Sequence, residues 1–150
     1  MTLLDNVSSQ DVIQGSLGNC YLLSVCSTIA EFPKRLEKIF LVKELNAAGI
    51  YCVLLFVDGE AKKVIIDDRI PYEKSIKNLP FAKLGKNKNI WPILIEKAWA
   101  KYLGNYQNTI QGSPSEIFKI LTGAPSFYML KDKFNTADEL NAFWAQLQHF

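Results

Sequence analysis

One cysteine, preceded by two glycines and followed by an apolar run, constrains this chain more than any other feature. Cys20 opens the run 20–30, whose apolar spacing predicts a helix, and Gln14 stands six residues before it. A helix N-terminus has free N–H groups and a positive dipole end, and both lower the pKa of a thiol placed there. The same N–H groups, together with the Gln14 amide, can hold an oxyanion. Gly15 and Gly18 are expected to let the backbone turn tightly and to bring Gln14 and Cys20 together.

The alternative for Cys20 is a structural role, because free cysteines are usually buried and pack as small apolar residues. A glutamine, two glycines and a cysteine at a helix start favour a thiol nucleophile instead. Bulk composition agrees with a globular protein, since 49% of the 150 residues are hydrophobic and 21% are charged. The net charge of +2 argues against a nucleic-acid or membrane partner, which would need clustered lysine and arginine.

The cysteine count and the chain start favour a cytoplasmic protein. Cys20, Cys26 and Cys52 are an odd number without metal-ligand spacing, so no disulfide framework is predicted. Residues 1–6 lack the basic start and apolar core of a signal peptide. The longest apolar run, 51–57, is too short to span a bilayer.

Periodicity and turn signals predict a mixture of helices and short strands. The predicted helices cover 20–30, 34–45, 91–103, about 114–122 and a last segment opened by a capping box at 136–139; the predicted strands cover 51–57, 62–67 and 126–130. The apolar run 51–57 is expected to be a buried strand, and Asp58-Gly59 predicts a hairpin turn between it and the strand 62–67. Residues 71–89 are expected to form a long surface loop. In the helix 91–103, Glu96, Lys97, Ala100 and Lys101 are expected to share one face.

Residues 11–23 are similar to the nucleophile motif of the calpain family, within the papain-like cysteine proteases. That motif reads Asp-x-x-Gln-Gly-x-Leu-Gly-Asp/Asn-Cys-Trp/Tyr-Leu-Leu, and the chain matches it almost throughout. Further segments resemble family motifs in the family's order: 64–71, 91–101, 104–106, 112–116 and 121–123. The resemblance covers about residues 11 to 130.

The resemblance implies an α+β fold, the papain-like calpain protease core. Residues 1–123 would form the first, mainly helical lobe with a small β hairpin, and residues 124–150 would begin a second, β lobe. Cys20 would be the nucleophile, and Gln14 with the Cys20 N–H would stabilise the oxyanion. Gly112 matches a glycine that pairs with the backbone of an extended polypeptide substrate. The family has Gly-Gly there, whereas this chain has Gln111 before Gly112.

The general base of such a protease is missing from the resembling segments. The single histidine, His149, is near the end of the predicted last helix and lacks the family's Gly-His-Ala-Tyr context. We interpret it as a favourable charge at a helix C-terminus rather than as the base. The chain would therefore be inactive alone, as part of a longer protease or as a fragment that pairs with a second lobe. The alternative is a non-catalytic calpain-like interaction module.

Calcium is the one cofactor that the resemblance raises. Asp11 matches a carboxylate of the family's Ca²⁺ site in this lobe, but Asn89 replaces the acidic partner and Ser9 replaces an arginine that couples the site to the second lobe. A neutral ligand beside lysines weakens cation binding. We therefore expect weak Ca²⁺ binding at Asp11 or none, and no other cofactor is predicted.

Overall fold

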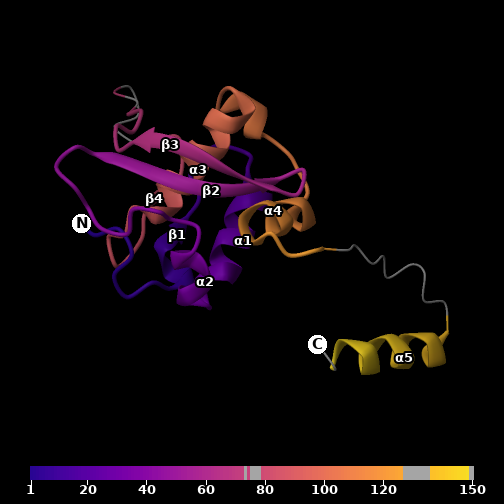
Figure 1. Ribbon diagram of the computed structural model, residues 1–150. Helices are drawn as coiled ribbons and strands as arrows, with labels where there is room; N and C mark the ends of the chain where they lie inside the picture. Colours follow the sequence, from indigo (N-terminus) through magenta and orange to yellow (C-terminus); the bar gives the residue numbers. More distant parts are fainter. Residues whose placement is uncertain (73, 75–78, 127–135, 149–150) are drawn as a thin grey trace.

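The computed structural model describes residues 1–72, 74, 79–126 and 136–148 (Figure 1). Its helices are α1 (Cys20–Ala30), α2 (Pro33–Glu37), α3 (Trp91–Leu103), α4 (Pro114–Thr122) and α5 (Ala137–Leu147), with short 3-10 turns η1 (Ser9–Asp11) and η2 (Gln107–Thr109). Its strands are β1 (Val12–Ile13), β2 (Ile50–Val57), β3 (Glu60–Asp67) and β4 (Lys83–Leu84). The bounds predicted for α1 and α3 are confirmed.

The core forms where α1, α3 and α4 pack together beneath the β2–β3 hairpin, which lies across the helices in Figure 1. Apolar side chains of all these elements meet there. They include Leu22, Val25, Val53, Leu55, Trp91, Leu94, Ile95, Ile117 and Leu121. Because α1 lies in this core, the backbone of its first turn has a fixed position in the molecule.

The β2–β3 hairpin confirms the turn that was predicted at Asp58–Gly59. Val57 pairs with Glu60, so the loop has two residues, and both have positive φ (53° and 79°) as a tight hairpin turn requires. The strand was expected to be buried, but only alternate residues such as Val53 and Leu55 are fully buried. The hairpin therefore covers the core with one face.

Two lysines of α3 fasten β3 to the helix. Lys97 Nζ donates to the Asp67 carboxylate and to the Arg69 carbonyl, the latter at 2.5 Å. Lys101 Nζ donates to the carbonyl of Ile65 at 2.7 Å. These bonds join the C-terminal half of β3 to the exposed side of α3.

The predicted helix 34–45 is wrong in length, since α2 ends at Glu37. Residues 39–41 form backbone hydrogen bonds with β2 instead of continuing the helix. Leu41 N donates to Cys52 O at 3.0 Å and Leu54 N donates to Ile39 O at 2.8 Å. Tertiary pairing of this kind competes with local helix propensity, which is a weak preference.

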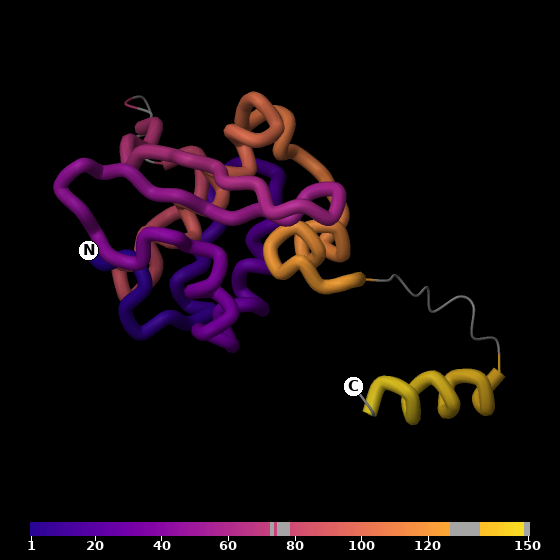
Figure 2. The backbone as a smooth tube through the Cα atoms, in the orientation of Figure 1, coloured from indigo at the N-terminus to yellow at the C-terminus, as the bar shows by residue number. Residues whose placement is uncertain are grey.

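The surface loop expected at 71–89 is wrong for its second half. β4 pairs antiparallel with β1, and Ala82 and Asn89 are fully buried. Thr2 forms a parallel bridge with Asn89, so the first residues of the chain run beside the segment that leads into α3, as Figure 2 shows. This segment therefore belongs to the folded body.

α5 confirms the predicted capping box, because Thr136 and Glu139 exchange hydrogen bonds between side chain and backbone. The helix lies apart from the other elements in Figures 1 and 2, and none of its residues is buried. Its apolar side chains Leu140, Trp144 and Leu147 are exposed. The predicted strand 126–130 falls largely on residues 127–135, outside the described residues.

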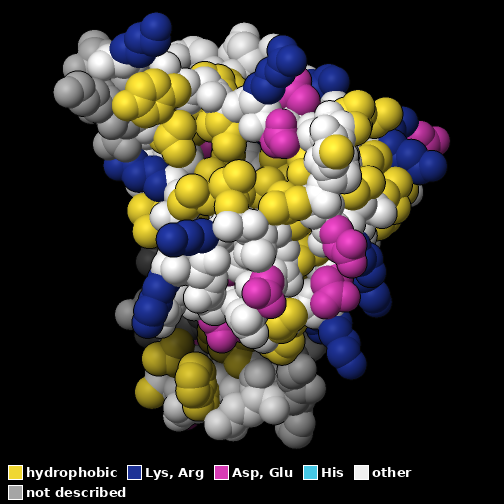
Figure 3. All heavy atoms as spheres, turned by 90° about the vertical axis from the view of Figure 1, so that its left-hand side faces the viewer, with side chains coloured by type: hydrophobic (Ala, Val, Ile, Leu, Met, Phe, Trp, Pro, Cys, Tyr) yellow, Lys and Arg dark blue, Asp and Glu magenta, His cyan; other side chains and the backbone are white. Residues whose placement is uncertain are grey.

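The face seen in Figure 3 carries a band of hydrophobic side chains among scattered basic and acidic ones. Charges of neither sign dominate that face, in line with the small net charge of +2. Among the described residues, no helix is long and apolar enough to cross a membrane.

Candidate active site

The N-terminal turn of α1 presents the Cys20 thiol to solvent. Cys20 is the first residue of the helix and is exposed. The N–H groups of Leu22 and Leu23 donate to the Asn19 carbonyl at 3.0 and 3.3 Å. The N–H groups of Cys20 and Tyr21 have no acceptor among the described residues, and no side chain there caps the helix. An exposed thiol therefore lies beside unsatisfied donors at the positive end of a helix dipole.

Gln14 belongs to the turn that leads into Cys20. Its Nε2 donates to the carbonyl of Leu17 at 2.8 Å, and the same carbonyl accepts the N–H of Asn19 at 2.9 Å. The Gln14 side chain is exposed and thus folds back over this turn. A primary amide has a second N–H, which remains available to an incoming acceptor.

A backbone contact from the segment before β4 supports this turn. Ser16 N and Leu17 N both donate to the Pro80 carbonyl, at 2.9 and 3.2 Å. A methyl group on Gly15 would overlap the Phe81 carbonyl, so glycine is required for close approach rather than for turning. Gly18 has room for a methyl group, and neither glycine has positive φ. The prediction that Gly15 and Gly18 are needed for a tight turn is therefore wrong.

Asn19 connects the same turn to α3. Its side chain is fully buried, and Nδ2 donates to Glu96 Oε1 at 2.5 Å. The other Glu96 oxygen accepts the N–H of Ala82 at 2.8 Å. Glu96 is only 1% exposed, which corrects the expectation that it shares a face with Lys97 and Lys101, and its burial raises its pKa.

Gly112 lies against the ring of Tyr21, so a methyl group there would overlap that ring. The Tyr21 hydroxyl accepts a hydrogen bond from Trp99 Nε1 at 2.9 Å, and this bond holds the ring in place. Gln111 N donates to Gly18 O at 3.1 Å, so this segment lies next to the turn before Cys20. Gln111 has a φ of 64°, a left-handed conformation that favours glycine, where the family motif has one.

The other two thiols differ from Cys20. Cys26 is buried within the core, and that burial raises its pKa above its usual range. Cys52 is half-buried on β2. His149 lies outside the described residues.

Asp11 and Asn89 do meet, but not as cation ligands. Asp11 Oδ2 accepts hydrogen bonds from Ser8 N (3.1 Å), Asn89 Nδ2 (2.9 Å) and Trp91 Nε1 (3.2 Å), and its side chain is fully buried. Asn89 Oδ1 accepts from Thr2 Oγ1 and Asp5 N. Because Ca²⁺ needs six to eight oxygen ligands, a carboxylate surrounded by N–H donors does not fit it. Among the described residues, no three His, Cys, Asp or Glu side chains gather into a metal site.

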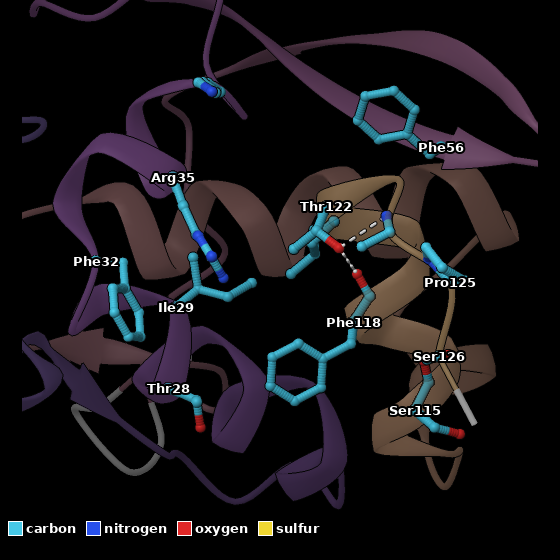
Figure 4. Close-up of a pocket in the computed structure, with 13 residues that line it drawn as sticks. Thr28, Ile29, Phe32, Arg35, Phe56, Ser115, Phe118, Thr122, Pro125 and Ser126 are labelled. Carbon is cyan, nitrogen blue, oxygen red and sulfur yellow. Dashed lines mark hydrogen bonds between the residues drawn. The ribbon is translucent and has the colours of Figure 1, made fainter. Parts of the chain in front are cut away.

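A pocket of about 620 Å³ lies at the other end of α1, away from Cys20. Thr28, Phe32, Phe118 and Pro125 lie around it in Figure 4, and Thr122 joins its wall by accepting from Ala124 N at 3.2 Å. Cys20, Gln14 and Gly112 are not in its lining. The thiol region and this pocket are thus separate.

Cys20, Gln14 and Gly112 were predicted as site residues from the sequence, whereas the buried contact of Asn19 with Glu96 behind them was not predicted. The one available signal is that Glu96 and Lys97 are the only charges between residues 91 and 100, and this pattern alone does not separate a buried carboxylate from an exposed one.

Comparisons with known proteins agree with this arrangement. A family model described as "Calpain family cysteine protease" matches residues 1–149. The chain is 33% identical over 147 residues to "Calpain-type cysteine protease ADL1" of Oryza sativa subsp. japonica, covering 97% of this chain and 7% of the relative. "Calpain-type cysteine protease DEK1" of Zea mays gives the same identity and coverage. "Calpain-12" of Homo sapiens is 31% identical over 124 residues, 81% of this chain and 17% of the relative.

The chain spans only 7% of the plant relatives and 17% of the human one. Within that span, the family match runs over the Cys20 turn, the β2–β3 hairpin and the helices that hold them. The chain belongs to the calpain family of cysteine proteases and forms part of its protease core, built from helices and small two-stranded sheets.

Proposed function

We propose that this chain is the nucleophile-bearing part of a calpain-type cysteine endopeptidase with a papain-like, two-lobed core. Residues 1–123 form the first lobe, and residues 124–150 begin a second lobe. The observation that carries the proposal is the exposed Cys20 thiol beside the unsatisfied N–H groups of Cys20 and Tyr21.

In the proposed reaction the Cys20 thiolate attacks the carbonyl carbon of a polypeptide substrate. A C–S bond forms, and the π electrons of the carbonyl move to its oxygen. The Cys20 N–H and the free N–H of Gln14 stabilise the resulting oxyanion. Expulsion of the amine then needs a proton donor.

The substrate and the base come from outside the nucleophile turn. Gly112 pairs with the extended substrate backbone, since its lack of a side chain leaves its own backbone accessible beside Tyr21. A histidine and an asparagine of the second lobe, supplied in cis or in trans, act as the base and its orienting group. The 150 residues alone are therefore not expected to turn over substrate, and Ca²⁺ is not required to assemble this lobe.

Selective labelling tests this proposal. The chain is treated with a peptidyl chloromethyl ketone or with iodoacetamide, and the modified cysteine is identified by peptide mass. We expect the peptidyl reagent to prefer Cys20 over Cys52 by more than about tenfold, and Gln14→Ala to reduce that preference. Cys20→Ala is the control. Equal labelling of Cys20 and Cys52 by both reagents would contradict the proposal and favour a non-catalytic calpain-like module.

A further inference from the structure

The side chain at the N-cap of α1 does not do what an N-cap asparagine ordinarily does. Such a side chain usually accepts an N–H from the second or third residue of its helix. Here no side chain caps α1, and the Asn19 amide instead donates to Glu96 in the interior. Asn19 Oδ1, which would be the capping atom, is buried without a partner among the described residues.

Glu96 is held in place independently of Asn19. Its second oxygen accepts the N–H of Ala82, and its backbone lies in the middle of the buried helix α3. The turn before Cys20 is also held independently, by the Pro80 carbonyl and by the bond from Gln111 N to Gly18 O. What depends on Glu96 is therefore the direction of the Asn19 side chain.

We propose that Glu96 is a positioning residue, which keeps the Asn19 amide in the interior and so leaves the first N–H groups of α1 open. Without the carboxylate, the Asn19 side chain is free to cap the helix. Its oxygen then accepts the N–H of Tyr21 and lies next to the Cys20 N–H, so its partial negative charge opposes an oxyanion held there. The inference rests on the proposed function, which assigns the oxyanion to the Cys20 N–H and the Gln14 amide.

A peptide aldehyde probes the oxyanion position at the Cys20 N–H directly. The Cys20 thiolate adds to the aldehyde carbon, the C–S bond forms, and the carbonyl π pair becomes an oxyanion that takes a proton from water. Iodoacetamide makes no oxyanion, because the thiolate displaces iodide from carbon. The dissociation constant of the aldehyde is measured by its protection of Cys20 against iodoacetamide, so both reactions are read at one thiol.

Glu96→Met removes the acceptor at similar volume, and we expect it to weaken aldehyde binding about fivefold, the equilibrium equivalent of one N-cap hydrogen bond. The iodoacetamide rate should change less than twofold.

Glu96→Gln can still bond both Asn19 and Ala82, because its amide offers an oxygen and an N–H, so it should stay near wild type. Glu96→Met combined with Asn19→Ala should recover aldehyde binding, since alanine cannot cap. Glu31→Gln, at the far end of α1, is the matched control.

Three results would overturn the proposal. The first is equal aldehyde affinity of Glu96→Met and wild type. The second is a loss of aldehyde affinity and of iodoacetamide rate by the same factor in Glu96→Met, and the third is a double variant that binds the aldehyde no better than Glu96→Met. A wild-type chain whose Cys20 the aldehyde does not protect would instead contradict the proposed function.

Amide hydrogen exchange then decides the role of Glu96 separately. The Tyr21 amide should become more protected in Glu96→Met than in wild type, while Phe32 at the other end of α1 stays unchanged. If Glu96→Met does not fold, Glu96→Gln combined with Asn19→Asp keeps the pair bonded and frees no capping amide. This combination should keep wild-type exchange at the Tyr21 amide, and increased protection there would contradict the proposal.

Discussion

Asp11 and Asn19 are both fully buried, and each has one side-chain oxygen without a partner among the described residues. Both are tied to α3, Asp11 by Trp91 Nε1 and Asn19 by Glu96. Their neighbourhoods differ. Asp11 accepts three hydrogen bonds from two segments of the chain. Asn19 instead donates its amide to Glu96 and lies next to the exposed Cys20 thiol.

This difference shows that a buried polar side chain does not by itself mark a site of chemistry. An acceptor that collects several donors joins segments and closes the space around itself, so it acts on stability. The Asn19 amide, which donates into the interior, does not cap α1 and so leaves the first N–H groups of that helix unsatisfied at the surface. The predictions below test whether the two clusters really divide in this way.

The largest difference is expected from alanine substitutions. Asp11→Ala leaves three donors unmatched in the interior and should lower the free energy of unfolding by about 3–5 kcal/mol. Asn19→Ala should cost only about 1–2 kcal/mol, because Glu96 keeps the bond from Ala82 N. Urea denaturation followed by circular dichroism measures both. Losses of equal size would remove the distinction between the clusters.

A smaller effect is expected around the Tyr21 ring. Gly112→Ala forces a methyl group against a ring that Trp99 holds, and should cost about 1–3 kcal/mol. Gly18→Ala, in the same region but with space for the methyl group, should change stability by less than about 0.5 kcal/mol. Thermal unfolding of the pair compares them. A Gly112→Ala variant as stable as Gly18→Ala would show that the ring can move aside.

The pH dependence of stability should reveal Glu96. Burial raises its pKa in the folded protein above the ordinary value of 4.5, so the folded chain holds this proton more tightly than the unfolded chain. The resulting stabilisation is present below that ordinary value and is lost as pH rises through the folded pKa. The stability of wild type relative to Glu96→Gln should therefore fall as the pH rises from 4.5 through the folded pKa of Glu96. A constant difference over that range would contradict the burial of an ionisable carboxyl at this position.

The smallest effect is expected from calcium. Because the Asp11 cluster is closed by N–H donors, millimolar Ca²⁺ should shift the melting temperature of the wild-type chain by no more than about 1 °C. Asn89→Glu replaces a donor by a second carboxylate beside Asp11, so this variant should be stabilised by Ca²⁺ more than wild type is. A shift of several degrees in the wild-type chain would show that the cluster can open to a cation.

Local signals allowed much of the fold to be predicted. The first residue of α1, both bounds of α3, the hairpin turn and the α5 capping box were all correct, because each depends on a few neighbouring residues. Errors occurred where partners are distant in sequence. Residues 39–41 pair with β2, and residues 83–84 pair with β1, which no local pattern indicates.

The candidate site divides in the same way. The position of Cys20 at a helix start followed from the apolar run that comes after it. The burial of Glu96 did not, since its polarity suggested solvent and its partner Asn19 lies 77 residues away. The reason for Gly15 was also hidden, because the Phe81 carbonyl that requires it comes from another segment.

The lysine bonds from α3 to β3 have a consequence for association between molecules. β3 pairs with β2 on one side, and its other side is an edge at which a strand of a second molecule could add. Lys101 Nζ occupies the Ile65 carbonyl, and Lys97 Nζ occupies the Arg69 carbonyl just beyond the strand. A foreign strand would have to displace two charged amines to pair there, which opposes edge-to-edge pairing between molecules.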